Sequence, residues 1–175
     1  SRQGDKRMVD LTKITDSANV EEFEKKRREA LLPHEGTWVH NIPFYLVPVD
    51  IVMGFRGNTF TPEEFYHSTE WTMANHWNAG YVKDGRIVIF MYGQHQSLER
   101  YLYVERISAS KSIQSRGNEG WEMVIKEAQR AAREKGCRYI WTTTFRRGEV
   151  KKFLEVSPDS VLNPPTMMVI RTDLK

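Results

Sequence analysis

The sequence predicts an α/β (α+β) fold, in which a mixed central β-sheet is flanked by helices and preceded by an N-terminal helical extension. Residues 100–108 and 138–144 have the composition of strands and enclose an amphipathic helix, and strands joined in this way lie parallel. Residues 79–83 and 86–93 flank Asp84-Gly85, a dipeptide typical of tight antiparallel hairpins. One sheet containing both kinds of pairing accounts for these observations.

The N-terminal third of the chain is predicted to be an arm, residues 1–57, distinct from a domain of ordinary size, residues 58–175. Residues 1–16 are polar and charged and show no periodicity. A helix is predicted from Asp16 to Leu32, where Pro33 ends it. Residues 38–53 are rich in β-forming types, but two prolines limit them to short or edge strands.

The domain is predicted to begin with a helix from Thr61 to about Trp77. Thr61 suits the N-cap, Pro62 the first helical position, and Glu64 the reciprocal position of a capping box. The hairpin at Asp84-Gly85 follows this helix.

The longest helix follows strand 100–108. Its apolar residues recur at helical spacing with charged residues between them, as in a helix packed on a sheet; they are Trp121, Val124, Ile125, Ala128, Ala131 and Ala132. After strand 138–144 the sequence predicts a short helix at 148–156 and a final strand at 166–172.

The loop that leads into the longest helix has features of a phosphate-binding loop. Gly117 and Gly120 allow a ligand to approach the backbone, and the helix N-terminus offers free N–H groups and the positive end of a dipole. Arg116 adds a full positive charge. This chemistry suits a diphosphate-bearing ligand, although a glycine-containing loop is also an ordinary way to turn a chain. No Gly-Lys-Ser/Thr follows, so the loop is not a Walker loop.

The order of elements, together with Gln114-Ser115-Arg116-Gly117, resembles the GNAT superfamily of acyl-coenzyme A N-acyltransferases over about residues 58–173. The resemblance implies that acyl-coenzyme A lies between splayed strands 100–108 and 138–144. Its pyrophosphate would meet the N–H groups of residues 115–120. The cofactor-binding residues expected on this basis are Gln114, Ser115, Arg116, Gly117, Asn118, Gly120 and Arg146.

Several features depart from the family pattern. Glu119 stands where Gly or Ala is usual, and its charge opposes a pyrophosphate unless the side chain turns outward. Phe153-Leu154 covers the position of the family's Tyr that protonates the departing thiolate, and phenylalanine has no proton to give. The stretch after residue 156 is compressed, so one strand of the terminal hairpin is expected to be missing or irregular.

Two residues of strand 100–108 are the catalytic candidates. Glu105 could act as the base that takes a proton from an amine; the alternative is a surface strand residue paired with Arg100 or Arg106. Tyr103, or Tyr101 on the same face, could supply a hydroxyl proton; the alternative is aromatic packing between strands.

The function expected from the resemblance is transfer of an acetyl or other acyl group from coenzyme A to an amine of a small molecule or protein. One alternative is an inactive GNAT-fold protein with a structural or interaction role in a larger assembly, such as a phage particle, docked through its N-terminal arm. Another is a nucleic-acid-associated protein that uses the basic residues between Arg146 and Lys152, although a net charge of +3 supports this only weakly.

Composition excludes several other classes. A single cysteine, Cys137, cannot form an internal disulfide or a four-cysteine zinc site, and we expect it to be a buried structural thiol. The histidines lack metal-ligand spacing, so no metal is expected; His95 could touch an acceptor. The longest apolar run, residues 87–91, is too short to span a membrane. No signal-type segment is present, so the expected location is cytoplasmic, or a virion for a phage protein.

Overall fold

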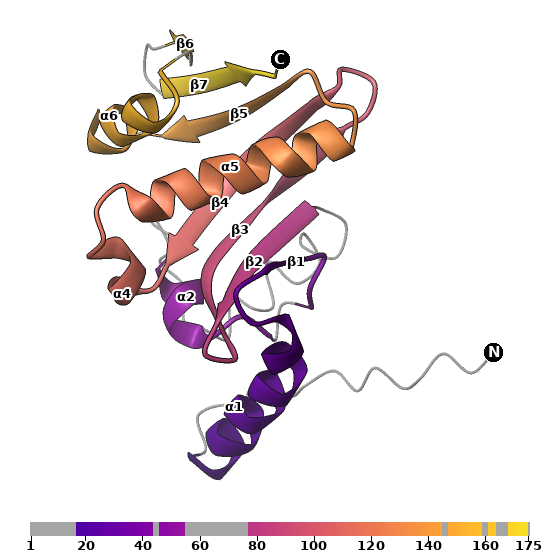
Figure 1. The fold of residues 1–175 in the computed structure, drawn as a ribbon, viewed down its shortest axis with the longest axis vertical. Helices are drawn as coiled ribbons and strands as arrows, with labels where there is room; N and C mark the ends of the chain where they lie inside the picture. The colour runs from indigo at the N-terminus through magenta and orange to yellow at the C-terminus, as the bar shows by residue number, and fades with distance from the viewer. Residues whose placement is uncertain are drawn as a thin grey trace, which may run out of the picture.

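A computed structural model describes residues 17–43, 46–54, 77–144, 147–158, 161–163 and 168–174. Its centre is a seven-stranded sheet in the order β1-β2-β3-β4-β5-β7-β6 (Figure 1). The strands are β1 Trp38–His40, β2 Trp77–Lys83, β3 Arg86–Gln96, β4 Tyr101–Ala109, β5 Tyr139–Thr144, β6 Val161–Asn163 and β7 Met168–Asp173. Among these described strands only β4 and β5 pair in parallel, so the predicted mixed sheet is confirmed.

Helices cover both faces of the sheet. They are α1 Ser17–Leu31, α2 Val49–Met53, α4 Lys111–Gln114, α5 Glu119–Glu134 and α6 Arg147–Val156, and a 3₁₀ turn at Leu32–His34 follows α1. In Figure 1, α5 lies across the sheet and α1 extends from the end formed by the β2–β3 hairpin. No helix in the described part of the chain is long and apolar enough to cross a bilayer.

The prediction of short or edge strands in residues 38–53 is confirmed for β1, a three-residue strand at the edge of the sheet, but it is wrong for residues 49–53, which form α2. The backbone of Pro48 is extended, and its carbonyl accepts hydrogen bonds from the amides of Ile51 and Val52, which starts the helical turn. Ile51 and Val52 then point into the core. The β-branched residues of 49–53, which favour a strand by composition, therefore form a short helix whose Ile51 and Val52 are buried.

The β2–β3 hairpin is confirmed, with Asp84 and Gly85 both in the left-handed region (φ 55° and 68°) that a type I′ turn requires. Glu35 accepts hydrogen bonds from both turn amides, at 2.7 and 3.0 Å, and these bonds lower the pKa of its carboxyl group. The helix predicted from Thr61 to about Trp77 lies outside the described residues, except for Trp77 itself, which begins β2.

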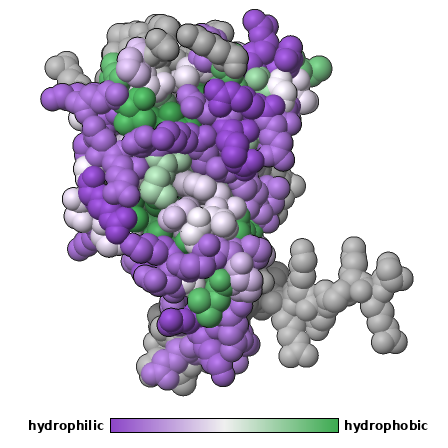
Figure 2. Space-filling view, viewed as in Figure 1, coloured by the Kyte–Doolittle hydropathy of each residue, from purple (hydrophilic) through white to green (hydrophobic). Residues whose placement is uncertain are grey.

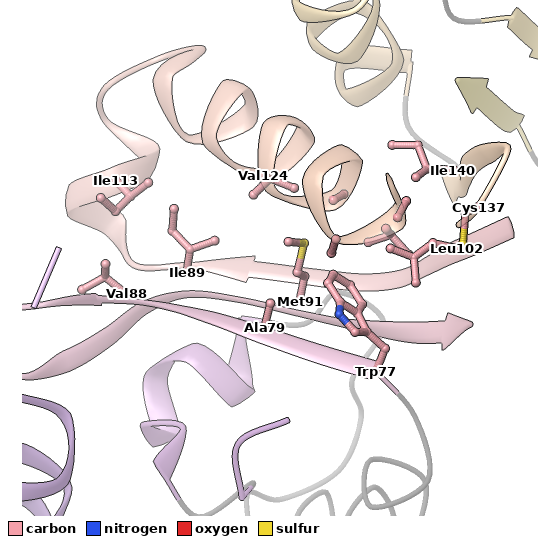
Figure 3. Close-up of a cluster of buried hydrophobic side chains, with 14 residues drawn as sticks. Trp77, Ala79, Val88, Ile89, Met91, Leu102, Ile113, Val124, Cys137 and Ile140 are labelled. Atoms are coloured by element: carbon pink, nitrogen blue, oxygen red, sulfur yellow. The ribbon is translucent and has the colours of Figure 1, made fainter. Parts of the chain in front are cut away.

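The main core lies between α5 and the sheet (Figure 3). Val124, Ala128, Ala131 and Ala132 of α5 are buried, which confirms the predicted helical face. They pack with residues of β3, β4 and β5, including Met91, Leu102 and Ile140. Cys137, just beyond α5, is a buried free thiol as expected, and burial raises its pKa.

Two smaller cores complete the packing. On the opposite face of β2 and β3, residues of α1, α2 and the segment between them surround Phe90 and Ile87; these are Leu31, Val47, Ile51 and Val52. Near the C-terminus, α6 packs against α5 and β7. The surface over α5 is mostly hydrophilic, with hydrophobic residues showing only in small separate areas (Figure 2).

A polar network centred on the buried carboxylate of Glu127 joins β1 to α5. The Nε2 atom of His40 lies 2.6 Å from a carboxylate oxygen of Glu127, and the indole of Trp77 donates to Nδ1 of the same imidazole at 3.2 Å. Arg130 donates to both carboxylate oxygens of Glu127. Burial alone would raise the pKa of Glu127, but the hydrogen bonds from His40 and Arg130 outweigh it and hold that pKa below 4.5.

Candidate functional site

The parallel strands β4 and β5 diverge midway along β4. Their register runs from Tyr101 opposite Tyr139 to Val104 opposite Thr142 and ends there, although β4 continues through residues 105–109. At the last pair the hydroxyl of Thr142 donates to the Val104 carbonyl at 2.8 Å, so a side chain bonds the strands where they diverge. We call this point the fork.

A β-bulge at the fork sets the position of Glu105. Arg106 pairs with Tyr92 on β3, but Val104 pairs with Gly93, so Glu105 has no counterpart on that strand. The strands come very close here, because a Cβ on Gly93 would lie only 1.7 Å from the carbonyl oxygen of Tyr103. Bulges of this kind redirect a side chain and are frequent beside active sites.

Glu105 is half-buried, and its Oε2 atom is buried without a hydrogen-bond partner in the described structure. The alternative interpretation, in which it pairs with Arg100 or Arg106, is not supported. No ion pair within 4.0 Å joins Glu105 to any described residue. Arg100 instead donates to the carbonyl of Gly136 at 3.1 Å. A buried carboxylate oxygen without a partner is costly, which is why such groups mark sites for a ligand.

Tyr103 reaches across the fork. Its hydroxyl lies 3.0 Å from the hydroxyl of Thr143, one residue beyond the last pair on β5. Its ring stacks on Trp141 with centroids 4.1 Å apart, and Tyr101 stacks on Tyr139 at 5.5 Å. Both interpretations of Tyr103 therefore have a structural basis: the ring packs between strands while the hydroxyl lies at the fork.

The loop after β4 is more ordered than the sequence suggests. Residues 111–114 form the one-turn helix α4, at the end of the sheet toward which β4 runs in Figure 1. The Gln114 side chain donates to the Ala109 carbonyl at 2.7 Å. The Ser115 hydroxyl donates to the Ser112 carbonyl at 2.9 Å. The side chains of Gln114 and Ser115 thus hold the loop in shape.

The two loop glycines play different roles. Gly117 has φ +66°, and nothing lies within 4 Å of where its Cβ would be, so the backbone there is open. A Cβ on Gly120 would lie 2.9 Å from the Ile113 side chain, so this glycine lets α5 pack closely on α4. The amides of Gly117 and Asn118 donate to no carbonyl in the described structure, and α5 begins at the next residue. Open amides at a helix N-terminus suit an anion.

Charges near the loop partly cancel. Arg116 pairs with Glu119 at 3.5 Å, and both side chains are exposed, so Glu119 turns toward a cation at the surface. The side-chain amide of Asn118 donates to the carboxylate of Glu155 on α6 at 2.8 Å, which ties the loop to that helix. Arg146 lies outside the described residues.

Other candidates lie elsewhere. Phe153 is buried in α6 near the Trp121 ring, so its position serves packing. His95 is on β3 opposite Leu102, where β4 and β5 are still paired, so the structure does not bring it to the fork; burial and Lys135 lower its pKa. No group of three potential metal ligands occurs among the residues that the structure describes.

Sequence reasoning missed Thr142, Thr143 and Gly93. Nothing in the run of threonines at 142–144 indicates which hydroxyl faces β4, because that depends on the register of strands far apart in the chain. Gly93 inside a strand pattern is a recognised sign of a bulge. That signal was available in the sequence.

The fold is shared with solved acetyltransferases, although no family model and no curated protein matches the chain. An IAA acetyltransferase from Bacillus cereus superposes with a TM-score of 0.60 at 9% identity, covering 79% of this chain and 100% of that one. A GNAT family acetyltransferase from Elizabethkingia anophelis with acetyl-CoA bound gives 0.60 at 11%, covering 79% and 97%. A putative GNAT family acetyltransferase from Desulfovibrio desulfuricans gives 0.57 at 15%, covering 79% and 100%.

Proposed function

We propose, from the GNAT fold of this chain, that it transfers an acyl group, most simply acetyl, from coenzyme A to an amine of a small molecule or protein. Because a fold does not assign an activity, the proposal depends on the site. One observation carries it: β4 leaves β5 after Val104, and the open amides of the Gly117 loop follow at the same end of β4.

The loop fits the phosphate portion of coenzyme A. The amides of Gly117 and Asn118, with those of the first turn of α5, would bind the pyrophosphate. Gln114 and Ser115 would keep the loop in shape through their bonds to neighbouring carbonyls. Coenzyme A supplies the acyl group already activated as a thioester.

The positively charged residues and the second glycine have supporting roles in this proposal. Arg116 would provide positive charge to the pyrophosphate when its ion pair with Glu119 is broken. Arg146 would bind the 3′-phosphate. Gly120 contributes by allowing α5 to begin close to α4, which brings the helix N-terminus to the loop.

Glu105 and Tyr103 would handle the protons. Glu105 would take the proton from the acceptor's ammonium group, which frees the nitrogen lone pair for attack. Its buried oxygen, which bonds no residue in the described part of the chain, is available for that bond. Tyr103 would provide the proton needed by the departing sulfur. Phe153, at the position of the family's proton donor, cannot do so because it has no hydroxyl. The bond to Thr143 holds the Tyr103 hydroxyl at the fork.

The second candidate is a GNAT-fold protein without catalysis, acting as a structural or interaction module. It is favoured by Glu119, which places a negative charge in the first turn of α5, and by Phe153, which is buried where a proton donor would be expected. This candidate predicts no acyl transfer to any amine.

Calorimetric titration with acetyl-coenzyme A tests the proposed site. Wild type is expected to bind, and Gly117→Glu to lose binding because it adds a carboxylate beside the open amides. Gly36→Glu is a matched control, because Gly36 also has a positive φ (+72°) and open space around its Cβ position. The control introduces the same charge and the same backbone strain at a site far from the loop in the chain.

Two outcomes separate the candidates. If wild type does not bind at millimolar acetyl-coenzyme A, the acyltransferase proposal is wrong. If it binds but releases no thiol with any amine in a coupled colorimetric assay, the inactive candidate is correct. Equal loss of affinity in Gly117→Glu and Gly36→Glu would show that the site is not at the Gly117 loop.

A further inference from the structure

Two adjacent residues of opposite charge lie on β4 just beyond the fork and do not pair with each other. Glu105 has a buried oxygen without a partner among the residues that the structure describes, and Arg106 is exposed. Neither forms an ion pair within 4.0 Å among the described residues. Because they remain apart, neither charge is neutralised by the other.

Tyr92 connects these two charges. It lies opposite Arg106 in the sheet, is only 5% exposed, and its hydroxyl accepts a hydrogen bond from the Arg106 guanidinium. Burial, and secondly the charge of Glu105, raise the pKa of Tyr92 to about 12, while Arg106 opposes the change. Arg106 bonds this phenol and the charge of Glu105 acts on it, so both side chains lie in the neighbourhood of Tyr92.

This point is on the sheet face opposite α5. Tyr92 belongs to the core formed with α1 and α2, whereas α5 packs on the other face. Ser108, two residues after Arg106 and therefore on the same face, donates to the Ile51 carbonyl of α2 at 2.6 Å. A ligand at Glu105 and Arg106 would thus approach from the face away from α5, which leaves the Gly117 loop free for coenzyme A.

We infer that the amine acceptor also carries a carboxylate close to its amino group, as an α-amino acid does. This inference rests on the proposed function and names its substrate class. A simple cationic amine placed at Glu105 would be repelled by Arg106, whose charge no described carboxylate balances. A carboxylate on the acceptor removes that repulsion, because a guanidinium binds it with two parallel hydrogen bonds.

The reaction balances with these groups. The acceptor's ammonium gives one proton to Glu105, and its nitrogen forms a bond to the acyl carbon of the thioester. The nitrogen's second proton restores the Tyr103 hydroxyl after Tyr103 has given its own proton to the sulfur. The carbon–sulfur bond breaks, and the sulfur takes its electron pair and then a proton. The acceptor's carboxylate stays on Arg106 unchanged, so Arg106 determines specificity and takes no part in bond making.

The test uses matched acceptors: each amino acid and the amine that remains after its decarboxylation, assayed with acetyl-coenzyme A. For the preferred amino acid, kcat/KM is expected to exceed that of its decarboxylated partner by about tenfold or more. Arg106→Gln should raise KM for the amino acid about 10- to 100-fold and leave the decarboxylated amine unchanged or improved. Arg106→Lys should recover part of the loss.

Arg133→Gln is the control, since it removes another exposed arginine, in the last turn of α5. Circular dichroism melting establishes that each variant is folded. Equal kcat/KM for both members of every pair, or an equal effect of Arg106→Gln on both, would overturn the inference while the acyltransferase proposal stands.

If no amine is acetylated, the proposed function fails, and calorimetry decides whether the site binds its ligand. Amino-acid binding by wild type that is lost in Arg106→Gln and Glu105→Gln supports the site. Binding that is absent or insensitive to both changes refutes it.

Discussion

Replacing Gly93 with alanine should break the bulge that positions Glu105. The added Cβ would lie 1.7 Å from the Tyr103 carbonyl oxygen, 2.8 Å from its carbonyl carbon and 3.1 Å from the Glu105 nitrogen. All three are backbone atoms, so no side-chain rotation relieves the clash. To bring 1.7 Å up to 3.0 Å, below which Cβ contacts essentially do not occur, β3 and β4 must separate by about 1.3 Å.

The expected cost combines overpacking with lost ladder hydrogen bonds. Overpacking a well-packed site costs about 1–3 kcal/mol, and each hydrogen bond about 1 kcal/mol. We therefore expect Gly93→Ala to lower the free energy of unfolding by about 3 kcal/mol or more. Urea denaturation followed by circular dichroism measures it, with the slope compared between proteins to establish that unfolding remains two-state.

Gly148→Ala provides the comparison. Gly148 lies in the first turn of α6 with nothing within 4 Å of its Cβ position and no positive φ, so alanine there should be neutral or stabilising by up to about 1 kcal/mol. If Gly93→Ala loses less than about 1 kcal/mol relative to Gly148→Ala, the strands do not approach as described and the argument for Glu105 fails.

Three further predictions follow. Glu127→Gln should lower stability at pH 7 by about 3 kcal/mol, because it removes the buried carboxylate that His40 and Arg130 bind. Since the folded pKa of Glu127 lies below 4.5, this difference should be constant above pH 4.5 and shrink as the pH falls through the folded pKa; denaturation at several pH values measures it, and a difference that persists at the lowest pH contradicts the assignment. Glu119→Gln should tighten coenzyme A binding about two- to fivefold by removing a negative charge from the first turn of α5, and calorimetry that shows weaker binding would place the phosphates elsewhere. Tyr103→Phe should lower kcat at least about tenfold with little change in the KM for acetyl-coenzyme A, whereas an unchanged kcat would remove Tyr103 from the mechanism.

Elements that are specified by residues close together in the sequence were predictable. Asp84-Gly85 specifies a turn by its own backbone preferences, and the spacing of apolar residues in α5 marks the face that packs on the sheet. The parallel pairing of β4 and β5 follows from a helix joining two strands. Errors fell on short segments: α2 and α4 are single turns, whose few residues carry no periodic signal. The hairpin strand expected to be missing or irregular is present as the three-residue β6.

The sequence by itself determined the mixed sheet, its long covering helix and the candidate residues Glu105, Tyr103 and Gly117. Only the tertiary structure decided that Glu105 has a buried oxygen with no described partner, that Tyr103 meets Thr143 across the fork, and that Gly117 leaves its amide open. The physical reason is register. A one-residue bulge changes which side chains share a face, and that change depends on pairing between residues well separated in the chain.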